Sequence, residues 1–304
     1  MMVTVRDNFY PSCGEGMIHA RYWTPEVEPI AVVQLIHGIA EHVERYDDFA
    51  KYLCSHGYMV VAQDHMGHGK SNTAKGYFHG GWFAAVDDTY RLLQDTKAAY
   101  PDIPYILFGH SMGSFLARTI LAKYPESGLS GAIICGTGWM PEVVLAAGKT
   151  LAAIVCMLKG EQNPSKLLQT MMFGSYNNRI ENPRTEFDWL TRDEYIVDRY
   201  IEDPDCGFIA SAGLARDMLG GMRYNQNRKN LSKMNLETPV LFIAGNDDPV
   251  GNYGVGVNQT AKAFRNAGVQ NVSVKLYPLC RHEILNEINK LEVYGDILSW
   301  LQNL

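Results

Sequence analysis

The sequence offers little that would cross-link the chain or carry it into a membrane. Its six cysteines are widely spaced and include no C-x-x-C pair, so neither a disulfide framework nor a zinc ribbon is expected. The pattern predicts reduced thiols in a cytoplasmic protein. No apolar core of signal-peptide length follows the first methionine, so no secretion signal is expected. The most apolar stretch, 143–158, is interrupted by Gly148 and Lys149 and is too short for a transmembrane helix.

An excess of positive charge is also missing. Lysine and arginine number 27 against 33 aspartates and glutamates, a formal net charge of -6, so no electrostatic footprint for nucleic acid or an anionic membrane is present. The sequence contains no internal repeat and no low-complexity tract. Its 304 residues are 46% hydrophobic and 20% charged, which is ordinary for a globular protein and excludes a disordered chain, a collagen and a coiled coil.

What the sequence does contain is a regular alternation of apolar runs and helical segments. Segments with helical spacing and polar outer faces lie at 44–55, 82–100, 112–124, 253–267 and 284–301. Between them, six short runs are almost continuously apolar, as buried strands of a parallel sheet are. These runs lie at 31–36, 58–62, 104–108, 131–135, 240–244 and 272–277. The alternation predicts an open, mostly parallel sheet flanked by helices, the α/β class.

The alternation stops between about 140 and 212. This part of the chain has no strand signal; a Met-rich apolar portion is followed by a charged, Pro-broken portion at 182–204. So long an interruption predicts a helical lid, residues 140–212, inserted into a core formed by residues 1–139 and 213–304. The alternative is a buried helical subdomain that touches no ligand.

Residues 109–113 read Gly-His-Ser-Met-Gly, a G-x-S-x-G match. The match alone is weak, but it lies between a predicted strand and a predicted helix. That context is typical of a nucleophile elbow, in which a tight turn projects the serine hydroxyl above the sheet edge. The following helix N-terminus presents free N–H groups to developing negative charge. The pattern therefore predicts Ser111 as a nucleophile, with a structural Gly-Ser turn as the alternative.

A serine nucleophile needs a histidine as its base. Of the nine histidines only His282 follows Ser111, as the chain order serine, acid, histidine of such hydrolases requires. His282 lies in a strand-to-helix loop, and such loops gather at one edge of a parallel sheet. The acid is expected in the preceding loop, where Asp247 and Asp248 are adjacent. The residues alone favour Asp248, beside Pro249, and leave Asp247 open.

An oxyanion hole needs two backbone N–H donors. One is expected from Met112, after the nucleophile, and the other from Ile39 in the loop after the first buried strand. His37 and Gly38 are expected to hold that loop close to Ser111. A second glycine-rich loop, 64–71, matches neither a dinucleotide nor a P-loop pattern, so it is interpreted as a scaffold. Metal-ligand spacing such as H-E-x-x-H is absent from the sequence, and no metal or cofactor is expected.

These residues resemble the monoacylglycerol lipase and lysophospholipase-like group of α/β-hydrolases, often labelled serine aminopeptidase S33-like. The resemblance covers nearly the whole chain and implies the α/β-hydrolase fold. In that group the acid of the triad corresponds to Asp248, and the oxyanion donors correspond to Ile39 and Met112. The segments that carry it are HGIAEHVERY (37–46), DHMGHGKS (64–71), GHSMG (109–113), GNDDPV (245–250), the His282 loop and VDRYIEDP (197–204), which resembles the end of the lid.

The chain departs from the group at two positions outside the triad. Ser114 stands where the group usually has a second glycine after GHSMG. Met66 stands where the broader hydrolase pattern has an arginine.

The resemblance and the residues predict a serine hydrolase that cleaves a lipid-like carboxylic ester, such as a monoacylglycerol or a lysophospholipid, through an acyl-enzyme. Flexible methionines of the lid would line an acyl pocket. A short-chain or aryl esterase, a thioesterase or a peptidase of the same fold is the alternative, and a non-catalytic binding protein is a remote one. The expected partner is a small-molecule ester, with no nucleic acid and no stable membrane insertion. Apolar lid surfaces often pair, which leaves a homodimer open.

Overall fold

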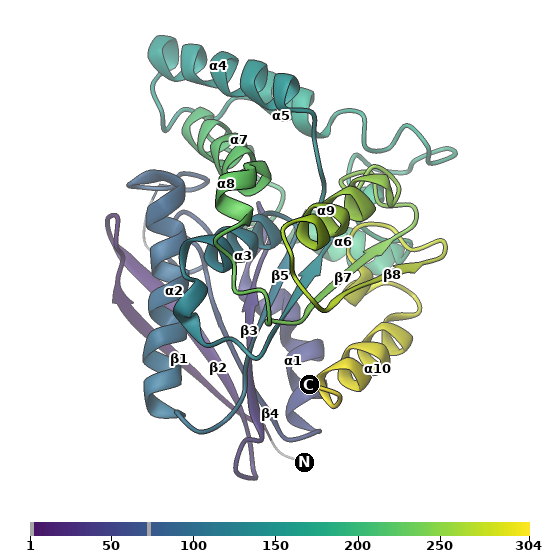
Figure 1. Cartoon of the computed structure of the whole chain (residues 1–304). Helices are drawn as coiled ribbons and strands as arrows, with labels where there is room; N and C mark the ends of the chain where they lie inside the picture. The colour runs from purple at the N-terminus through teal and green to yellow at the C-terminus, as the bar shows by residue number, and fades with distance from the viewer. Residues whose placement is uncertain (1–2, 72–73) are drawn as a thin grey trace.

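The computed structural model describes residues 3–71 and 74–304. One sheet runs through the molecule, helices lie on both of its sides, and α4 and α5 lie beyond one end (Figure 1). The strand order is β1-β2-β4-β3-β5-β6-β7-β8. The pairs β1–β2 and β2–β4 are antiparallel and the other pairs are parallel. The strands are β1 (Val3–Pro11), β2 (Met17–Pro25), β3 (Ala31–Ile36), β4 (Tyr58–Gln63), β5 (Tyr105–His110), β6 (Gly131–Cys135), β7 (Val240–Gly245) and β8 (Val272–Tyr277).

The helices follow the strands as a doubly covered sheet requires. They are α1 (Asp47–Cys54), α2 (Gly81–Ala99), α3 (Met112–Lys123), α4 (Glu142–Lys159), α5 (Lys166–Phe173), α6 (Glu194–Glu202), α7 (Ala212–Gln226), α8 (Arg228–Leu231), α9 (Val255–Asn266) and α10 (Lys290–Leu301). Four 3-10 turns accompany them: η1 (Val43–Tyr46), η2 (Pro125–Ser127), η3 (Asp188–Leu190) and η4 (Ile284–Asn286).

Helices bury both faces of the sheet. Successive strand residues point to opposite faces, so each strand contributes side chains to both cores. In β3, Val32 packs in the core shared with α2, α3 and α9. Its neighbour Val33 packs in the core shared with α1 and α10. Central strands therefore need apolar residues at every position, which explains the near-continuous apolar runs of the sequence.

All six predicted strands occur, at bounds that differ from the prediction by two residues or fewer. The prediction that 272–277 is buried on both faces is wrong. This strand, β8, pairs only with β7 at the sheet edge, and it alternates between partly buried and exposed positions. The hairpin β1–β2 was not predicted, because β1 lies at the other edge and most of its side chains are exposed.

Two predicted helices are shorter than expected. The segment 284–301 begins as the turn η4, and its α-helix starts only at Lys290. The segment 44–55 likewise opens with the turn η1 before α1. The other three predicted helices occur as α2, α3 and α9.

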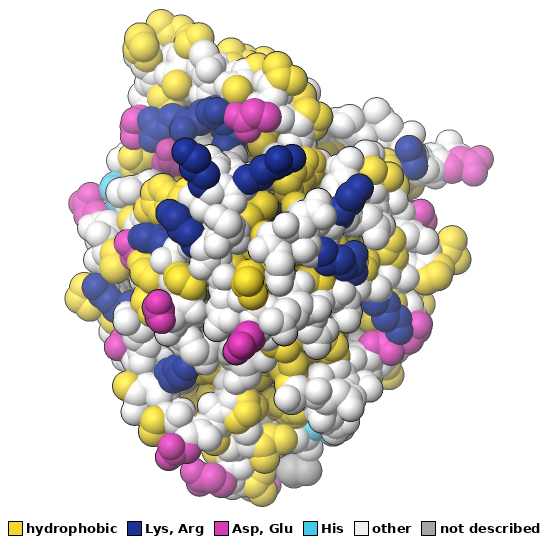
Figure 2. Space-filling model, in the orientation of Figure 1, with side chains coloured by type: hydrophobic (Ala, Val, Ile, Leu, Met, Phe, Trp, Pro, Cys, Tyr) yellow, Lys and Arg dark blue, Asp and Glu magenta, His cyan; other side chains and the backbone are white. Residues whose placement is uncertain are grey.

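The segment 140–212 contains α4, α5, η3 and α6 and, among its described residues, no strand beyond an isolated bridge. Helix α7, which follows it, packs against α4 and also against α3 and α2, so it joins this segment to the sheet domain. Several large apolar side chains of α4 are exposed, among them Val143, Met157 and Leu158, and Figure 2 shows hydrophobic side chains on the outer surface at that end. No helix among the described residues is long and apolar enough to cross a membrane.

Candidate active site

Ser111 occupies a strained turn between β5 and α3. Its backbone has φ 54° and ψ -120°, in a region that costs a non-glycine residue of order 1–3 kcal/mol. The flanking glycines make this turn possible. A Cβ added at Gly113 would lie 2.0 Å from the Ile36 carbonyl oxygen, and one added at Gly109 would lie 2.4 Å from the Gly113 oxygen. The G-x-S-x-G pattern is thus a steric requirement of the turn.

The two departures from the family pattern have local explanations. The hydroxyl of Ser114 donates a 2.6 Å hydrogen bond to the carbonyl oxygen of Ser111, so the side chain that replaces a glycine is fully accommodated at the start of α3. Met66 is completely buried in the core beside α2.

His282 lies against Asp248, and both are buried. Nδ1 of His282 is 3.0 Å from Oδ1 of Asp248, whereas Asp247 is exposed. The backbone N–H of Val250 also donates to Oδ1 of Asp248. On the other side of the ring, Nε2 of His282 is buried without a hydrogen-bond partner among the described residues. The imidazole is therefore oriented on one side and has an available nitrogen on the other.

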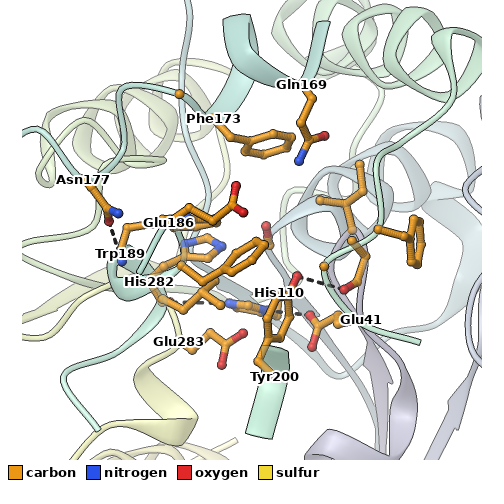
Figure 3. Close-up of a pocket in the computed structure, with 18 of the residues that line it drawn as sticks. Glu41, His110, Gln169, Phe173, Asn177, Glu186, Trp189, Tyr200, His282 and Glu283 are labelled. Atoms are coloured by element: carbon orange, nitrogen blue, oxygen red, sulfur yellow. Dashed lines mark hydrogen bonds and ion pairs between the residues drawn. The ribbon is translucent and has the colours of Figure 1, made fainter. Parts of the chain in front are cut away.

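Two cavities meet at Ser111. The first has a volume of about 170 Å³, and both Ser111 and His282 line it. Polar side chains share its wall with aromatic and aliphatic ones, so we call it the mixed cavity; Figure 3 shows Gln169 and Phe173 across it from Glu41 and His110. The second has a volume of about 510 Å³ and an apolar wall. Besides Ser111 it is lined by Ile39, Met112, Phe115, Met140, Val143, Val144, Ala147, Gly148, Leu151, Leu168, Met171, Met172, Phe173, Tyr176, Met218, Leu219, Met222 and Val250.

The loop after β3 approaches Ser111 closely. A Cβ added at Gly38 would lie 3.0 Å from Cβ of Ser111. His37 fixes this loop, since its Nε2 accepts a hydrogen bond from the backbone N–H of His65 and its Nδ1 is 2.7 Å from the Gly38 oxygen. Ile39 lines both cavities beside Ser111. The backbone of this loop and the start of α3 therefore face the same point.

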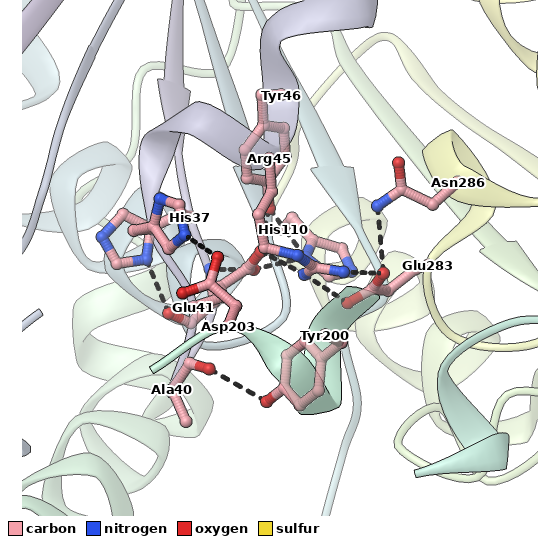
Figure 4. A network of polar contacts seen from close by, with 12 residues as sticks. His37, Ala40, Glu41, Arg45, Tyr46, His110, Tyr200, Asp203, Glu283 and Asn286 are labelled. Atoms are coloured by element: carbon pink, nitrogen blue, oxygen red, sulfur yellow. Dashed lines mark hydrogen bonds and ion pairs between the residues drawn. The ribbon is translucent and has the colours of Figure 1, made fainter. Parts of the chain in front are cut away.

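The carboxylate of Glu41 connects this loop to the rest of the site (Figure 4). It accepts hydrogen bonds from the backbone N–H of Gly38 at 2.6 Å, the hydroxyl of Tyr46 at 2.9 Å and the guanidinium of Arg45 at 2.8 Å. Nδ1 of His110, the residue before Ser111, lies 3.2 Å from the same carboxylate. The loop and the turn that carries Ser111 are therefore held by one buried group.

Arg45 extends the connection to the His282 loop. Its guanidinium makes two 2.6 Å hydrogen bonds to the carboxylate of Glu283, which is also buried. Burial acts to raise the pKa of Glu41, but His110 and Arg45 hold it well below its usual range. Burial acts to lower the pKa of His110, but the hydrogen bond with Glu41 raises it above its ordinary value. The two buried carboxylates thus share the guanidinium of Arg45, and the ring of His110 lies against one of them.

The space within the glycine-rich loop 64–71 is filled by one of the loop's own side chains, Asp64. The buried carboxylate of Asp64 accepts hydrogen bonds from the backbone N–H groups of Val43 and Lys70, and it lies 2.7 Å from Nδ1 of His19. A Cβ at Gly69 would lie 2.4 Å from this carboxylate. The loop closes on an aspartate, so it has no room for a phosphate.

A model of the serine aminopeptidase S33 family matches residues 27–289. The chain belongs to this family. It is 28% identical over 311 residues to a monoacylglycerol lipase of Mycolicibacterium smegmatis, covering 99% of each chain. It also superposes on the structure of a thermostable carboxyl esterase from Bacillus coagulans in complex with glycerol, with a TM-score of 0.91, 30% identity and 99% of both chains covered. A lipase in an open form gives a TM-score of 0.88, 27% identity and 99% of both chains covered.

Membership of the S33 family and the match to the esterase structure confirm the predicted α/β-hydrolase fold and the predicted family. The sequence analysis did not single out Glu41, Arg45 and Glu283. Two of them lie in the HGIAEHVERY segment and the third follows His282. The available signal was that these charged residues lie in or beside the segments that carry the site residues. Their pairing could not be predicted, because it depends on contacts between loops far apart in the chain.

Three buried histidines beside the loop after β3 make the stability of this S33-family chain depend on pH. His37, His65 and His68 are buried together, with ring centroids 4.1 to 6.0 Å apart. Burial lowers the pKa of all three, that of His68 to about 3. Since an unfolded histidine titrates near 6.5, the unfolded chain binds more protons below that pH, and the free energy of unfolding falls as the pH falls.

We expect His68→Gln to reduce this pH dependence. Without this histidine, the unfolded and folded chains should differ by about one bound proton less. Between pH 6 and pH 5 the free energy of unfolding of the variant should therefore fall by about 1.4 kcal/mol less per pH unit than that of the wild type. Urea unfolding at several pH values measures the slope. The exposed His56 supplies the control, because His56→Gln should keep the wild-type slope. An unchanged slope in His68→Gln would contradict the assignment of a neutral buried imidazole.

Proposed function

We propose that the protein is a serine hydrolase that cleaves a monoacylglycerol through an acyl-enzyme. In this proposal Ser111 is the nucleophile, His282 is its general base and Asp248 orients the imidazole and stabilises its protonated form. The backbone N–H groups of Met112 and Ile39 bind the oxyanion.

The proposed reaction has two steps. The hydroxyl oxygen of Ser111 attacks the ester carbon while Nε2 of His282 takes its proton, and the same proton then passes to the departing alcohol. Water next attacks the acyl carbon while His282 takes a proton from that water, and His282 then gives this proton to the hydroxyl oxygen of Ser111 as the bond to the fatty acid breaks. The buried, unpartnered Nε2 of His282 and the 3.0 Å contact of Nδ1 with Asp248 support these roles.

One observation carries the choice of substrate: a large apolar cavity and a smaller mixed cavity meet at Ser111. The apolar cavity of about 510 Å³ suits an acyl chain, and its methionines adapt to an irregular apolar ligand. The smaller, mixed cavity beside His282 has carboxylate and amide side chains that can bind the hydroxyl groups of a small alcohol. A substrate with a long acyl chain and a compact polar alcohol fits both.

The relatives support the same substrate class. The protein from Mycolicibacterium smegmatis is named a monoacylglycerol lipase, and the Bacillus coagulans carboxyl esterase was solved with glycerol. Both align with almost the whole of this chain.

The charges around the mixed cavity favour a neutral alcohol over a phosphate ester. Glu41, Glu186 and Glu283 line it, and no lysine or arginine is among its described lining residues. Arg45 pairs with both Glu41 and Glu283, whereas Glu186 is exposed and belongs to none of the ion pairs found among the described residues. A lysophospholipid phosphate would meet this carboxylate, so we propose a monoacylglycerol rather than a lysophospholipid.

We also propose that residues 140–212 act as the lid. Helices α4 and α5 contribute Val144, Leu151 and Met171 to the apolar cavity wall, so the segment both covers the site and contacts the acyl chain. The cytoplasmic location and the homodimer stay predictions from the sequence.

A p-nitrophenyl ester series from acetate to palmitate tests the proposal. Wild-type activity should rise toward medium or long chains and vanish in Ser111→Ala. Ala147 lines the apolar cavity, so Ala147→Phe should fill it and lower kcat/KM for laurate at least tenfold while that for acetate falls less than twofold. The measurement is the initial rate of nitrophenol release at each chain length.

Thr150 provides the matched control on the same helix. It is exposed and does not line the cavity, so Thr150→Phe should leave the chain-length profile unchanged. Wild-type activity confined to acetate and butyrate would contradict the lipid-directed pocket and favour the short-chain esterase alternative. Equal losses on laurate and acetate in Ala147→Phe would contradict the assignment of the acyl cavity.

A second prediction concerns the alcohol. The wild type should hydrolyse 1-lauroylglycerol at least ten times more efficiently than 1-lauroyl lysophosphatidic acid. Glu186→Gln should narrow this ratio about fivefold, because removing one exposed like charge from the cavity wall relieves about 1 kcal/mol of repulsion. Fatty-acid release from each substrate measures the ratio.

Glu181, an exposed acid of the same segment that does not line the cavity, is the control. Glu181→Gln should keep the wild-type ratio. A wild-type preference for the phosphate ester, or a ratio unmoved by Glu186→Gln, would show that this carboxylate does not set the head-group preference.

A further inference from the structure

Three side chains of metal-binding type gather where the loop after β3 meets the segment after α6. They are His42, Asp203 and Cys206, and one ligand atom of each lies within 4.8 Å of those of the other two. Nε2 of His42 is 2.9 Å from Oδ2 of Asp203. His42 and Cys206 are each 8% exposed. The cluster lies outside the nucleophile site and has no role in the reaction proposed above.

The backbone around the cluster is fixed by hydrogen bonds. The N–H of Cys206 donates to the carbonyl oxygen of Asp203 at 3.0 Å, which sets these two side chains on one turn. Across the junction, the N–H of Gly207 and the hydroxyl of Tyr200 both donate to the carbonyl oxygen of Ala40 (Figure 4). The two chain segments therefore hold His42 opposite the Asp203–Cys206 turn without any metal.

An imidazole, a carboxylate and a thiol are the ligand types that Zn²⁺ takes in proteins. A tetrahedral Zn²⁺ at its usual bond lengths keeps its ligand atoms roughly 3.3 to 3.8 Å apart. Side-chain shifts of about 1 Å would bring this cluster to that geometry. His42 and Asp203 also line a surface groove of about 580 Å³, which gives a cation access and a water for the fourth position.

The charges of the cluster suit a divalent cation. The carboxylate of Asp203 and a thiolate at Cys206 together neutralise Zn²⁺, with His42 neutral. The nearby cation Arg45 is already balanced by Glu41 and Glu283. Binding would release the thiol proton of Cys206 to solvent and leave the ring proton of His42 on Nδ1.

We propose that His42, Asp203 and Cys206 form a binding site for Zn²⁺ or a similar thiophilic divalent cation. The metal would join the segment after α6 to the loop that carries Ile39 and Glu41. No ligand spacing in the sequence could show the site, because its residues come from segments far apart in the chain. The competing account is that His42 and Asp203 form a plain ion pair and that Cys206 only packs against Trp189, Leu190 and Tyr200.

Cobalt(II) provides a direct test, since a thiolate bound to Co²⁺ gives an intense near-ultraviolet charge-transfer absorption. Reduced, chelator-treated wild-type protein titrated with CoCl₂ should develop this absorption at one equivalent, and ZnCl₂ should remove it. Cys206→Ser should abolish it. Cys13, the exposed cysteine, supplies the control, and Cys13→Ser should keep the wild-type spectrum.

Two further variants keep the thiol and remove another ligand. His42→Asn and Asp203→Asn should each weaken Co²⁺ binding at least tenfold, which tests the site even where Cys206→Ser does not fold. ZnCl₂ should also raise the Tm of the wild type but not that of Cys206→Ser. Absence of the absorption in folded wild-type protein, its survival in Cys206→Ser or its loss in Cys13→Ser would overturn the proposal.

Discussion

The arrangement of the site depends on the hydrogen bonds and the ion pair of the buried Glu41 carboxylate. It binds the backbone of Gly38, the guanidinium of Arg45 and the ring of His110, and so connects the loop after β3 to the turn that carries Ser111. Arg45 carries the connection to Glu283, beside His282. Removing one member of a buried ion pair typically costs 3–5 kcal/mol, because the partner charge is left uncompensated. The balance of charge within this network therefore keeps three loops at fixed positions around Ser111.

That rigidity gives a physical reason for the strained serine. A residue at φ 54° stays there only where its surroundings determine it. Here Gly113 packs directly on the Ile36 carbonyl and Gly38 lies against Ser111. The hydroxyl is thereby placed where the apolar and mixed cavities meet. The walls of the two cavities come largely from other elements.

The central architecture could be predicted from the sequence because burial on both faces leaves a direct signal. Strands β3 and β6 have the predicted bounds and are mostly apolar, with Gln34 as the polar residue of β3. Edge strand β1 exposes most of its side chains and was not predicted. Edge strand β8 also has the predicted bounds, but it has only one neighbour, so its burial alternates along the strand.

The residues of the site also divide into those that the sequence could predict and those that it could not. Ser111 and His282 could be chosen because local pattern and chain order restrict the alternatives. The residues alone left Asp247 open beside Asp248, since only the folded loop turns one toward His282 and the other toward solvent. Other features depend on how the segment 140–212 packs on the sheet domain. These are the position of Glu186 on the mixed cavity and the approach of Cys206 to His42. No local pattern encodes such contacts.

The measurement that tests the central claim most directly is covalent labelling with an alkyl fluorophosphonate, followed by mass spectrometry of the proteolytic peptides. A serine activated by His282 should react stoichiometrically, with the added mass on the peptide that contains Ser111. Ser111→Ala should take up no label, and His282→Ala should react at least a hundredfold more slowly. Labelling of another residue in the wild type, or of folded Ser111→Ala at the wild-type rate, would contradict the assignment of the nucleophile.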